Sequence, residues 1–136
     1  ASSVYPNADI RFIDAPSDDV PKLLASADVL ILPLKKGVGK YSIPSKLAGY
    51  MHSGKPVLAY IDADSDAADI IIDAGCGWVI QSGDEPALVK KMEEVVIMQD
   101  ETLSKFGSAG KVYALQYLSK KANLEKLIEA IERVLV

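Results

Sequence analysis

Apolar residues along the chain fall into short runs separated by amphipathic segments. Four of these runs are strand candidates: 10–13 (IRFI), 28–34 (DVLILPL), 55–61 (KPVLAYI) and 77–81 (GWVIQ). The second and third are apolar along most of their length, as strands covered on both faces tend to be. The pattern therefore predicts a sheet buried between two layers of helices.

Helical spacing marks the segments between the runs. The predicted helices cover 17–27, 65–74 and 84–98, with a further one opening at Pro44. Ser65 suits the start of the second helix as a cap, and Gly75 suits its left-handed end. This alternation predicts one α/β domain over residues 1–136, a Rossmann-like three-layer αβα sandwich. Its sheet should be mostly parallel, with about four strands.

Strand signals stop after about residue 99, so we expect extra helices at the C-terminus. Residues 101–119 predict one or two short helices, interrupted near Gly107 and Gly110. Residues 121–136 predict a closing helix with a buried apolar stripe. That stripe comprises Leu124, Leu127, Ile128, Ile131, Val134 and Leu135.

Composition excludes several classes of protein. The 136 residues are 49% hydrophobic and 25% charged, which is typical of a globular protein. The net charge of −4 argues against nucleic acid as a partner of the whole surface. The single cysteine, Cys76, favours a reducing compartment. No apolar run approaches the roughly 18 to 20 residues of a membrane span, and the first residues lack the pattern of a signal peptide. We expect a soluble, cytoplasmic protein.

In open α/β sheets, ligands bind beyond the carboxyl ends of the strands. Three segments follow strand candidates: Asp14 to Pro16, residues 34–43, and Asp62 to Ser65. The segment 34–43 is the richest, because its two glycines permit close backbone approach. It also carries the cations Lys35, Lys36 and Lys40.

This loop enters a helix at Pro44, a residue suited to a first helical turn. The free N–H groups of Ser45, Lys46 and Leu47 would point back toward the loop, where the helix dipole favours negative charge. A phosphate or diphosphate fits this arrangement. A surface loop with solvated lysines explains the same residues, since neither a complete GxGxxG nor a Walker motif is present.

Longer segments of the chain carry a family resemblance. The run from Ile43 to Asp62, followed by residues 67–95, resembles the C-terminal, donor-binding half of retaining GT-B glycosyltransferases of the group 1, family 4 type. The positions that match are Pro44, Leu47, Met51, Gly54, Pro56, Val57, Gly75, Gly77, Gly83, Asp84, Ala87 and Leu88. The Pro-Ser-Lys version is similar to the colanic-acid and O-antigen transferases of bacteria. The resemblance extends over nearly the whole chain.

This resemblance implies transfer of a hexosyl unit from a UDP-sugar, or a similar nucleotide sugar, to a saccharide or lipid-linked acceptor. It implies no metal and no other cofactor. Donor and phosphate contacts would come from Gly37, Gly39, Lys40, Tyr41, Ser42, Ile43, Ser45, Lys46, Leu47 and Gly49. Asp14 and Ala15 would lie near the nucleobase.

The resemblance also implies a preceding acceptor-binding domain, which this chain lacks. We therefore expect a piece of a larger transferase that has no catalytic residue of its own and is inactive alone. The full-length protein would lie in the cytoplasm, peripherally at the inner face of the cell membrane.

Two positions depart from the family pattern. Many relatives carry two glutamates with seven residues between them, one at the donor sugar and one at the ribose. The aligned residues here are Tyr41 and Gly49. Close approach of a ligand and close helix packing explain Gly49 equally well. The alternative function is a degenerate transferase domain, or a regulatory α/β module, that acts only in protein interaction.

The acidic cluster Asp62, Asp64, Asp66 and Asp69 admits two interpretations. It could bind a metal or sugar hydroxyls, or it could cap the following helix and complement its dipole. The capping interpretation is preferred, because no EF-hand spacing or histidine accompanies the cluster.

Overall fold

Three parallel strands form the sheet in the computed structural model, which describes residues 9–135. They are β1 (Leu30–Pro33), β2 (Val57–Ile61) and β3 (Gly77–Gln81), in the order β1-β2-β3. The register places Val57 of the central strand beside Leu30 on one side and Gly77 on the other.

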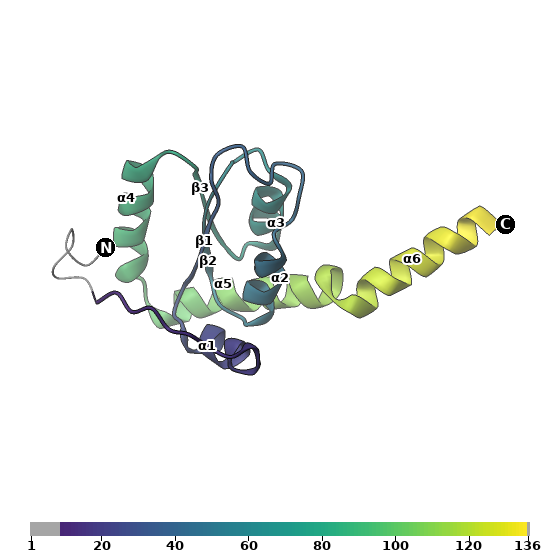
Figure 1. Ribbon diagram of the computed structural model, residues 1–136, viewed down its shortest axis with the longest axis horizontal. Coiled ribbons are helices and arrows are strands. Elements are labelled where there is room, and N and C mark those ends of the chain that lie inside the picture. Colours follow the sequence, from purple (N-terminus) through teal and green to yellow (C-terminus); the bar gives the residue numbers. More distant parts are fainter. Residues whose placement is uncertain (1–8, 136) are drawn as a thin grey trace.

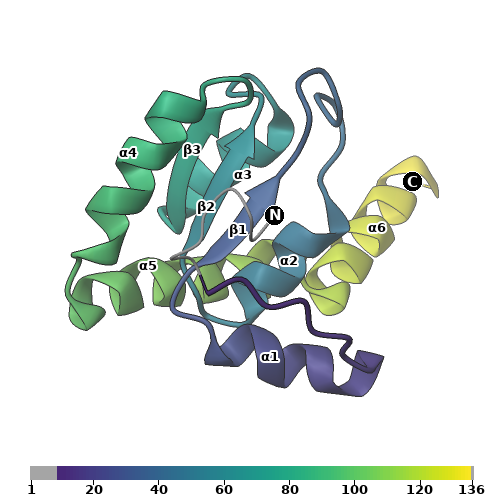
Figure 2. The same cartoon turned by 60° about the vertical axis from the view of Figure 1, so that its left-hand side comes forward.

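Helices lie on both faces of this sheet (Figures 1 and 2). The helices α2 (Ser45–His52) and α3 (Asp66–Ala74) cover one face, and α4 (Glu85–Val96) lies on the other. In Figure 2, the loops that follow the strands gather at one edge, while α5 (Asp100–Tyr113) runs along the opposite edge. The predicted Rossmann-like α/β sandwich is confirmed, with three strands instead of about four.

Local capping signals produce the predicted boundaries of α3 and the predicted start of α4. The Ser65 hydroxyl accepts from the Ala68 amide at 3.3 Å, and Gly75 ends α3 with φ 60°. The Asp84 carboxylate accepts from the Ala87 amide at 3.0 Å at the start of α4. These local bonds satisfy N–H groups that have no partner within the helix.

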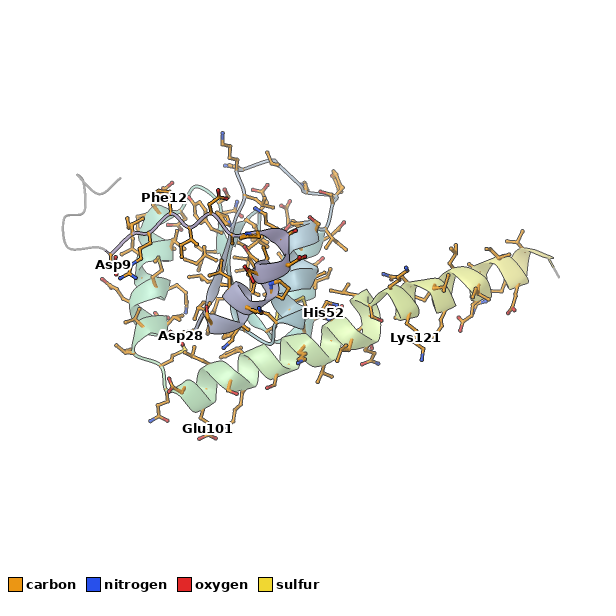
Figure 3. All side chains as sticks on the ribbon, turned by 60° about the horizontal axis from the view of Figure 1, so that its bottom comes forward. Asp9, Phe12, Asp28, His52, Glu101 and Lys121 are labelled. Carbon is orange, nitrogen blue, oxygen red and sulfur yellow. The ribbon has the colours of Figure 1, made fainter. Side chains whose placement is uncertain are left out.

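The predicted strand at 10–13 is wrong. This segment is extended but pairs with no strand in the described part of the chain. Phe12 is 90% exposed (Figure 3). A strand needs a neighbour to receive its backbone hydrogen bonds, so an apolar run alone does not make one. The chain then forms a 3₁₀ turn, η1 (Ser17–Asp19), and α1 (Val20–Ser26).

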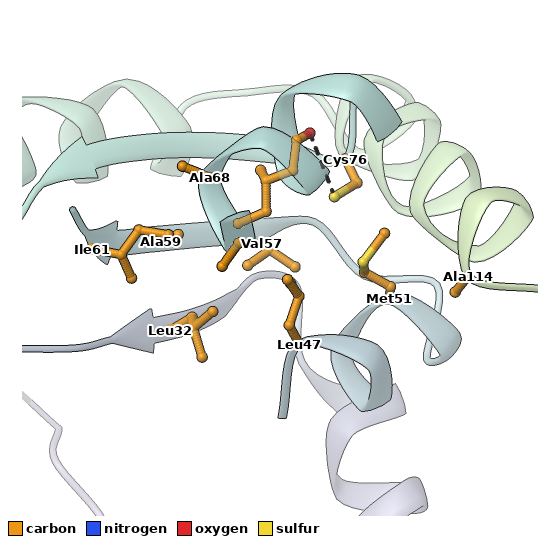
Figure 4. Close-up of a cluster of buried hydrophobic side chains, with 11 residues drawn as sticks. Leu32, Leu47, Met51, Val57, Ala59, Ile61, Ala68, Cys76 and Ala114 are labelled. Carbon is orange, nitrogen blue, oxygen red and sulfur yellow. Dashed lines mark hydrogen bonds between the residues drawn. The ribbon is translucent and has the colours of Figure 1, made fainter. Parts of the chain in front are cut away.

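The hydrophobic core lies between the sheet and the α2–α3 layer (Figure 4). It contains Leu32, Leu47, Met51, Val57, Ala59, Ile61, Ala67, Ala68, Ile71, Cys76 and Ala114. The other face of β1 is less well covered, since Ile31 is 43% exposed there. An open groove of about 410 Å³ runs past Ile31, Leu58 and Met92 on that face. The α4 layer therefore covers the sheet incompletely.

The predicted interruption near Gly107 and Gly110 is wrong, because α5 runs through both residues. A Cβ atom at Gly107 would lie 2.0 Å from the Gly54 carbonyl oxygen, and one at Gly110 would lie 2.8 Å from Cys76 Cβ. The two glycines thus permit close approach of α5 to the loops that precede β2 and β3. They do not end the helix.

The helical path changes direction after the π-helical turn η2 (Ala114–Leu118). Ser119 is extended, with ψ 153°, and its hydroxyl accepts from the Ala122 amide at 3.1 Å. This cap starts α6 (Lys120–Leu135), which extends away from the sheet (Figure 1).

The predicted buried stripe of α6 is wrong. Its apolar members Leu124, Leu127, Ile128, Ile131 and Val134 are all exposed, and the side chain of the sixth member, Leu135, lies outside the described part of the structure. The helix leaves the body after η2, so the rest of residues 9–135 provides no surface to cover the stripe. The amphipathic spacing identified the apolar face of the helix, but it does not show whether another element covers that face.

Candidate functional site

Three loops meet at the carboxyl edge of the sheet. They are the β1–α2 loop (34–44), the β2–α3 loop (62–65) and the β3–α4 loop (82–84). Ser82 connects all three strands at this edge: its hydroxyl donates to the Leu34 carbonyl at 2.8 Å, and its amide to the Ile61 carbonyl at 2.9 Å. The edge is therefore hydrogen-bonded across the strands, and its loops have fixed relative positions.

The glycine loop, residues 34–43, makes two tight turns. The Val38 amide donates to the Lys35 carbonyl at 3.0 Å, and the Ser42 amide to the Gly39 carbonyl at 3.2 Å. Gly37 and Gly39 have φ of 77° and 82°, a region that other residues rarely adopt. The backbone therefore requires both glycines for its shape.

Asp62 fixes the glycine loop to the sheet. This residue is only 7% exposed. Its Oδ2 accepts from the Gly37 amide at 2.6 Å, and its Oδ1 accepts from Gln81 Nε2 at 3.1 Å. The Gln81 Oε1 atom accepts in turn from the Ala63 amide at 2.9 Å. A buried carboxylate requires such partners, and here they join the ends of all three strands.

Lys40 forms an ion pair with Asp64. Its Nζ lies 2.6 Å from Asp64 Oδ2. The shared hydrogen bond raises the pKa of Lys40 and lowers the pKa of Asp64. The Asp66 amide also donates to the Lys40 carbonyl, at 3.3 Å. Asp64 of the β2–α3 loop thus holds the side chain of Lys40, and Asp66 at the start of α3 holds its backbone.

Two expectations for the start of α2 need correction. Pro44 precedes the helix as its N-cap instead of opening the first turn, and it offers no capping side chain. The Leu47 amide donates to the Pro44 carbonyl at 3.0 Å, so this N–H is already used. The Leu47 side chain is fully buried in the core. The exposed start of α2 is therefore formed by Ser45 and Lys46.

The structure brings most of the predicted donor residues together at this edge. Gly37, Gly39, Lys40, Tyr41, Ser42 and Ile43 lie in the glycine loop, directly before α2. Tyr41 is 84% exposed. In the described residues, no ion pair involves Lys35, Lys36 or Lys46. These cations and the helix start make the edge suitable for an anion.

Gly49 lies on the exposed side of α2. A Cβ atom there would meet no atom within 4 Å. Close helix packing therefore does not explain this glycine within residues 9–135. The space in front of Gly49 is open to a ligand.

Asp14 and Ala15 lie in the extended segment before η1. Within the described residues, no hydrogen bond or ion pair joins them to the glycine loop. Their predicted position near a nucleobase stays a prediction.

The roles of several residues that shape the site were not predicted from the sequence. Capping explains Ser65 and the first-turn positions of Asp66 and Asp69, but it is wrong for Asp62 and Asp64, which hold the glycine loop. The Tyr60 hydroxyl, also missed, accepts from the Gly83 amide at 2.7 Å and donates to Glu85 Oε1 at 2.8 Å. Asp62 and Ser82 directly follow strands, and this position was the signal in the sequence that could have identified them as site residues.

Comparison with known proteins identifies the class to which this α/β domain belongs. The family described as "Glycosyl transferases group 1" matches residues 3–97. The chain therefore belongs to the group 1 glycosyltransferases.

A curated relative agrees with this assignment. The chain is 29% identical over 112 residues to "Probable glycosyltransferase WbjE" of Pseudomonas aeruginosa, and the match covers 82% of this chain and 27% of the relative. The chain thus spans about a quarter of that protein's length. No solved structure gives a significant match. None of the helices within residues 9–135 combines the length and apolarity needed to cross a bilayer.

Proposed function

We propose that this chain is the nucleotide-sugar-binding domain of a glycosyltransferase that moves a hexosyl unit from a UDP-sugar to a saccharide or lipid-linked acceptor. The glycine loop carries the proposal. Its two left-handed glycines lead into an α2 start that lacks a side-chain cap. This arrangement lies at the carboxyl edge of a parallel sheet, where such folds bind ligands, in a chain of a glycosyltransferase family.

The α2 start would hold the donor diphosphate. The amides of Ser45 and Lys46 and the helix dipole favour negative charge there, and the Lys46 side chain adds a cation. These groups would stabilise the nucleotide diphosphate as it leaves and the glycosidic bond to it breaks. This countercharge makes a metal unnecessary in our proposal.

Other parts of the donor would extend along the loop and α2. Tyr41, Ser42 and Ile43 are exposed beside the helix start, and Gly49 leaves space next to it. We place the sugar and ribose along this surface, and the nucleobase near Asp14 and Ala15.

The chain would need an acceptor-binding domain to act. Its match to only 27% of a curated relative supports a larger enzyme. We propose that the 136-residue chain is inactive alone, and that the full-length protein works in the cytoplasm at the inner face of the membrane. The Pro-Ser-Lys sequence at the junction of the glycine loop and α2 supports a relation to the colanic-acid and O-antigen transferases.

Calorimetric titration of the chain with UDP tests the site. We expect Lys46→Ala to weaken UDP binding by about tenfold or more, because a hydrogen bond to a charged group is lost. Lys121→Ala is the matched control, since it removes one positive charge on α6, remote from the sheet (Figure 3).

Equal UDP affinity in the wild type and Lys46→Ala would exclude Lys46 as a phosphate ligand. A wild-type chain that does not bind UDP would contradict the proposed site. That result would favour the degenerate, interaction-only domain suggested by Tyr41 and Gly49.

A further inference from the structure

We propose that Asp64 competes with the phosphates of the ligand for Lys40, and so sets the charge that a ligand must carry to bind. The proposal rests on the proposed function, because it concerns the same glycine loop. It assigns Asp64 a role in selecting the ligand.

The ion pair can exchange its partners. The Lys40 and Asp64 side chains are 43% and 67% exposed, so water and solutes reach both. Exposed ion pairs contribute little to stability. A lysine side chain also has several rotatable bonds, and its ammonium can turn to a new partner at small cost.

The backbone of the loop does not depend on this ion pair. Asp62 holds the Gly37 amide at 2.6 Å, and the Lys40 carbonyl accepts from the Asp66 amide at 3.3 Å. The Lys40 side chain can therefore leave Asp64 while the loop keeps its place. Exchange changes one side-chain rotamer and leaves the fold intact.

Charge determines which ligands can make the exchange. A neutral ligand gains nothing from Lys40 and leaves it with Asp64. A diphosphate carries more negative charge than one carboxylate and provides several acceptor oxygens. It can therefore replace Asp64, at the expense of the original ion pair. Asp64 thereby lowers the affinity for every anion and favours those of high charge.

A double-mutant cycle tests the exchange by calorimetric titration with UDP. The variants are Asp64→Asn, Lys40→Ala and the double substitution. Asp69→Asn is the charge-matched control, because Asp69 lies in the first turn of α3, directly after the β2–α3 loop, and forms no ion pair with Lys40 in the described residues. We expect Asp64→Asn to bind UDP roughly two- to fivefold more tightly than the control, the range typical of an exposed ion pair.

This gain should disappear in the Lys40→Ala background, and uridine, which carries no phosphate, should show no gain. Tighter UDP binding of equal size with and without Lys40 would overturn the exchange and leave only a through-space effect of charge. Equal affinity of Asp64→Asn and Asp69→Asn would also overturn it.

The two proposals fail in different ways. If the wild type binds UDP and Asp64→Asn gains nothing, only the exchange is overturned. If neither the wild type nor Asp64→Asn binds UDP, the proposed function is contradicted and the exchange with it.

Discussion

The carboxylate of Asp62 accepts a hydrogen bond from the Gly37 amide at 2.6 Å, although 25 residues separate them in the sequence. This contact attaches the glycine loop to the end of the central strand. Ser82 adds a second attachment through the Leu34 carbonyl at 2.8 Å. The loop conformation is therefore determined by neighbouring strands as well as by its own glycines.

Removal of the Asp62 carboxylate should loosen the glycine loop. We expect Asp62→Ala to weaken UDP binding by about tenfold, because the Gly37 N–H group and the Gln81 side-chain amide lose a charged acceptor. Calorimetry measures the affinity, and thermal unfolding reports the accompanying loss of stability.

Asp62→Asn is the comparison, since one amide oxygen can still accept from Gly37. We expect it to retain more affinity than Asp62→Ala. Wild-type affinity in the alanine variant would show that the loop does not need this attachment.

The open space at Gly49 predicts that a substitution there raises stability and lowers donor affinity. Gly49→Ala should raise the free energy of unfolding by about 1 kcal/mol, because alanine favours a helix and the Cβ meets no atom. The same methyl group should weaken UDP-sugar binding, if the donor passes over this face of α2. Chemical denaturation and calorimetry measure the two quantities. Increased stability with unchanged affinity would remove Gly49 from the donor site.

The contact between α5 and the loop before β2 should not tolerate a side chain. We expect Gly107→Ala to destabilise the chain by about 3 kcal/mol, because its Cβ would lie 2.0 Å from the Gly54 carbonyl oxygen. Ser108→Ala, at the next and exposed position of α5, is the matched control and should change stability little. Urea denaturation of the two variants gives their unfolding midpoints. Equal unfolding midpoints for Gly107→Ala and Ser108→Ala would mean that α5 can move away from the loop before β2.

The exposed stripe of α6 should be dispensable for the stability of the domain. Ile131→Ser should change the free energy of unfolding by less than about 0.5 kcal/mol, as exposed substitutions usually do. Leu47→Ala, in the core, should cost about 2 to 5 kcal/mol. Denaturation of the two variants makes the comparison. A large loss for Ile131→Ser would show that the stripe is buried in solution.

Features that depend on neighbouring residues were predictable from the sequence. The helix α3 begins and ends as predicted, because Ser65 and Gly75 act within one turn. The strands β2 and β3 also follow their apolar runs. The loop 34–43 was recognised because its two glycines and three lysines all lie within residues 35–40.

Features that depend on distant partners were not predictable. The segment 10–13 has the apolar composition of a strand, but it pairs with no strand within the described chain. Gly107 resembled a helix break, because its contact with Gly54 is far away in sequence. Asp62 resembled a helix cap for the same reason, since its partner Gly37 precedes it by 25 residues. In each case, tertiary contacts decided what the residue does.

The glycine contacts of α5 and the polar contacts of the glycine loop lie at opposite edges of the sheet (Figure 2). The amino edge carries tight packing, and the carboxyl edge carries the hydrogen bonds and charges of the site. Substitutions at well-separated positions tend to act additively. Substitutions that change the charges of the candidate site at the carboxyl edge can therefore be combined with substitutions that restore stability at the amino edge, because the two sets should act independently.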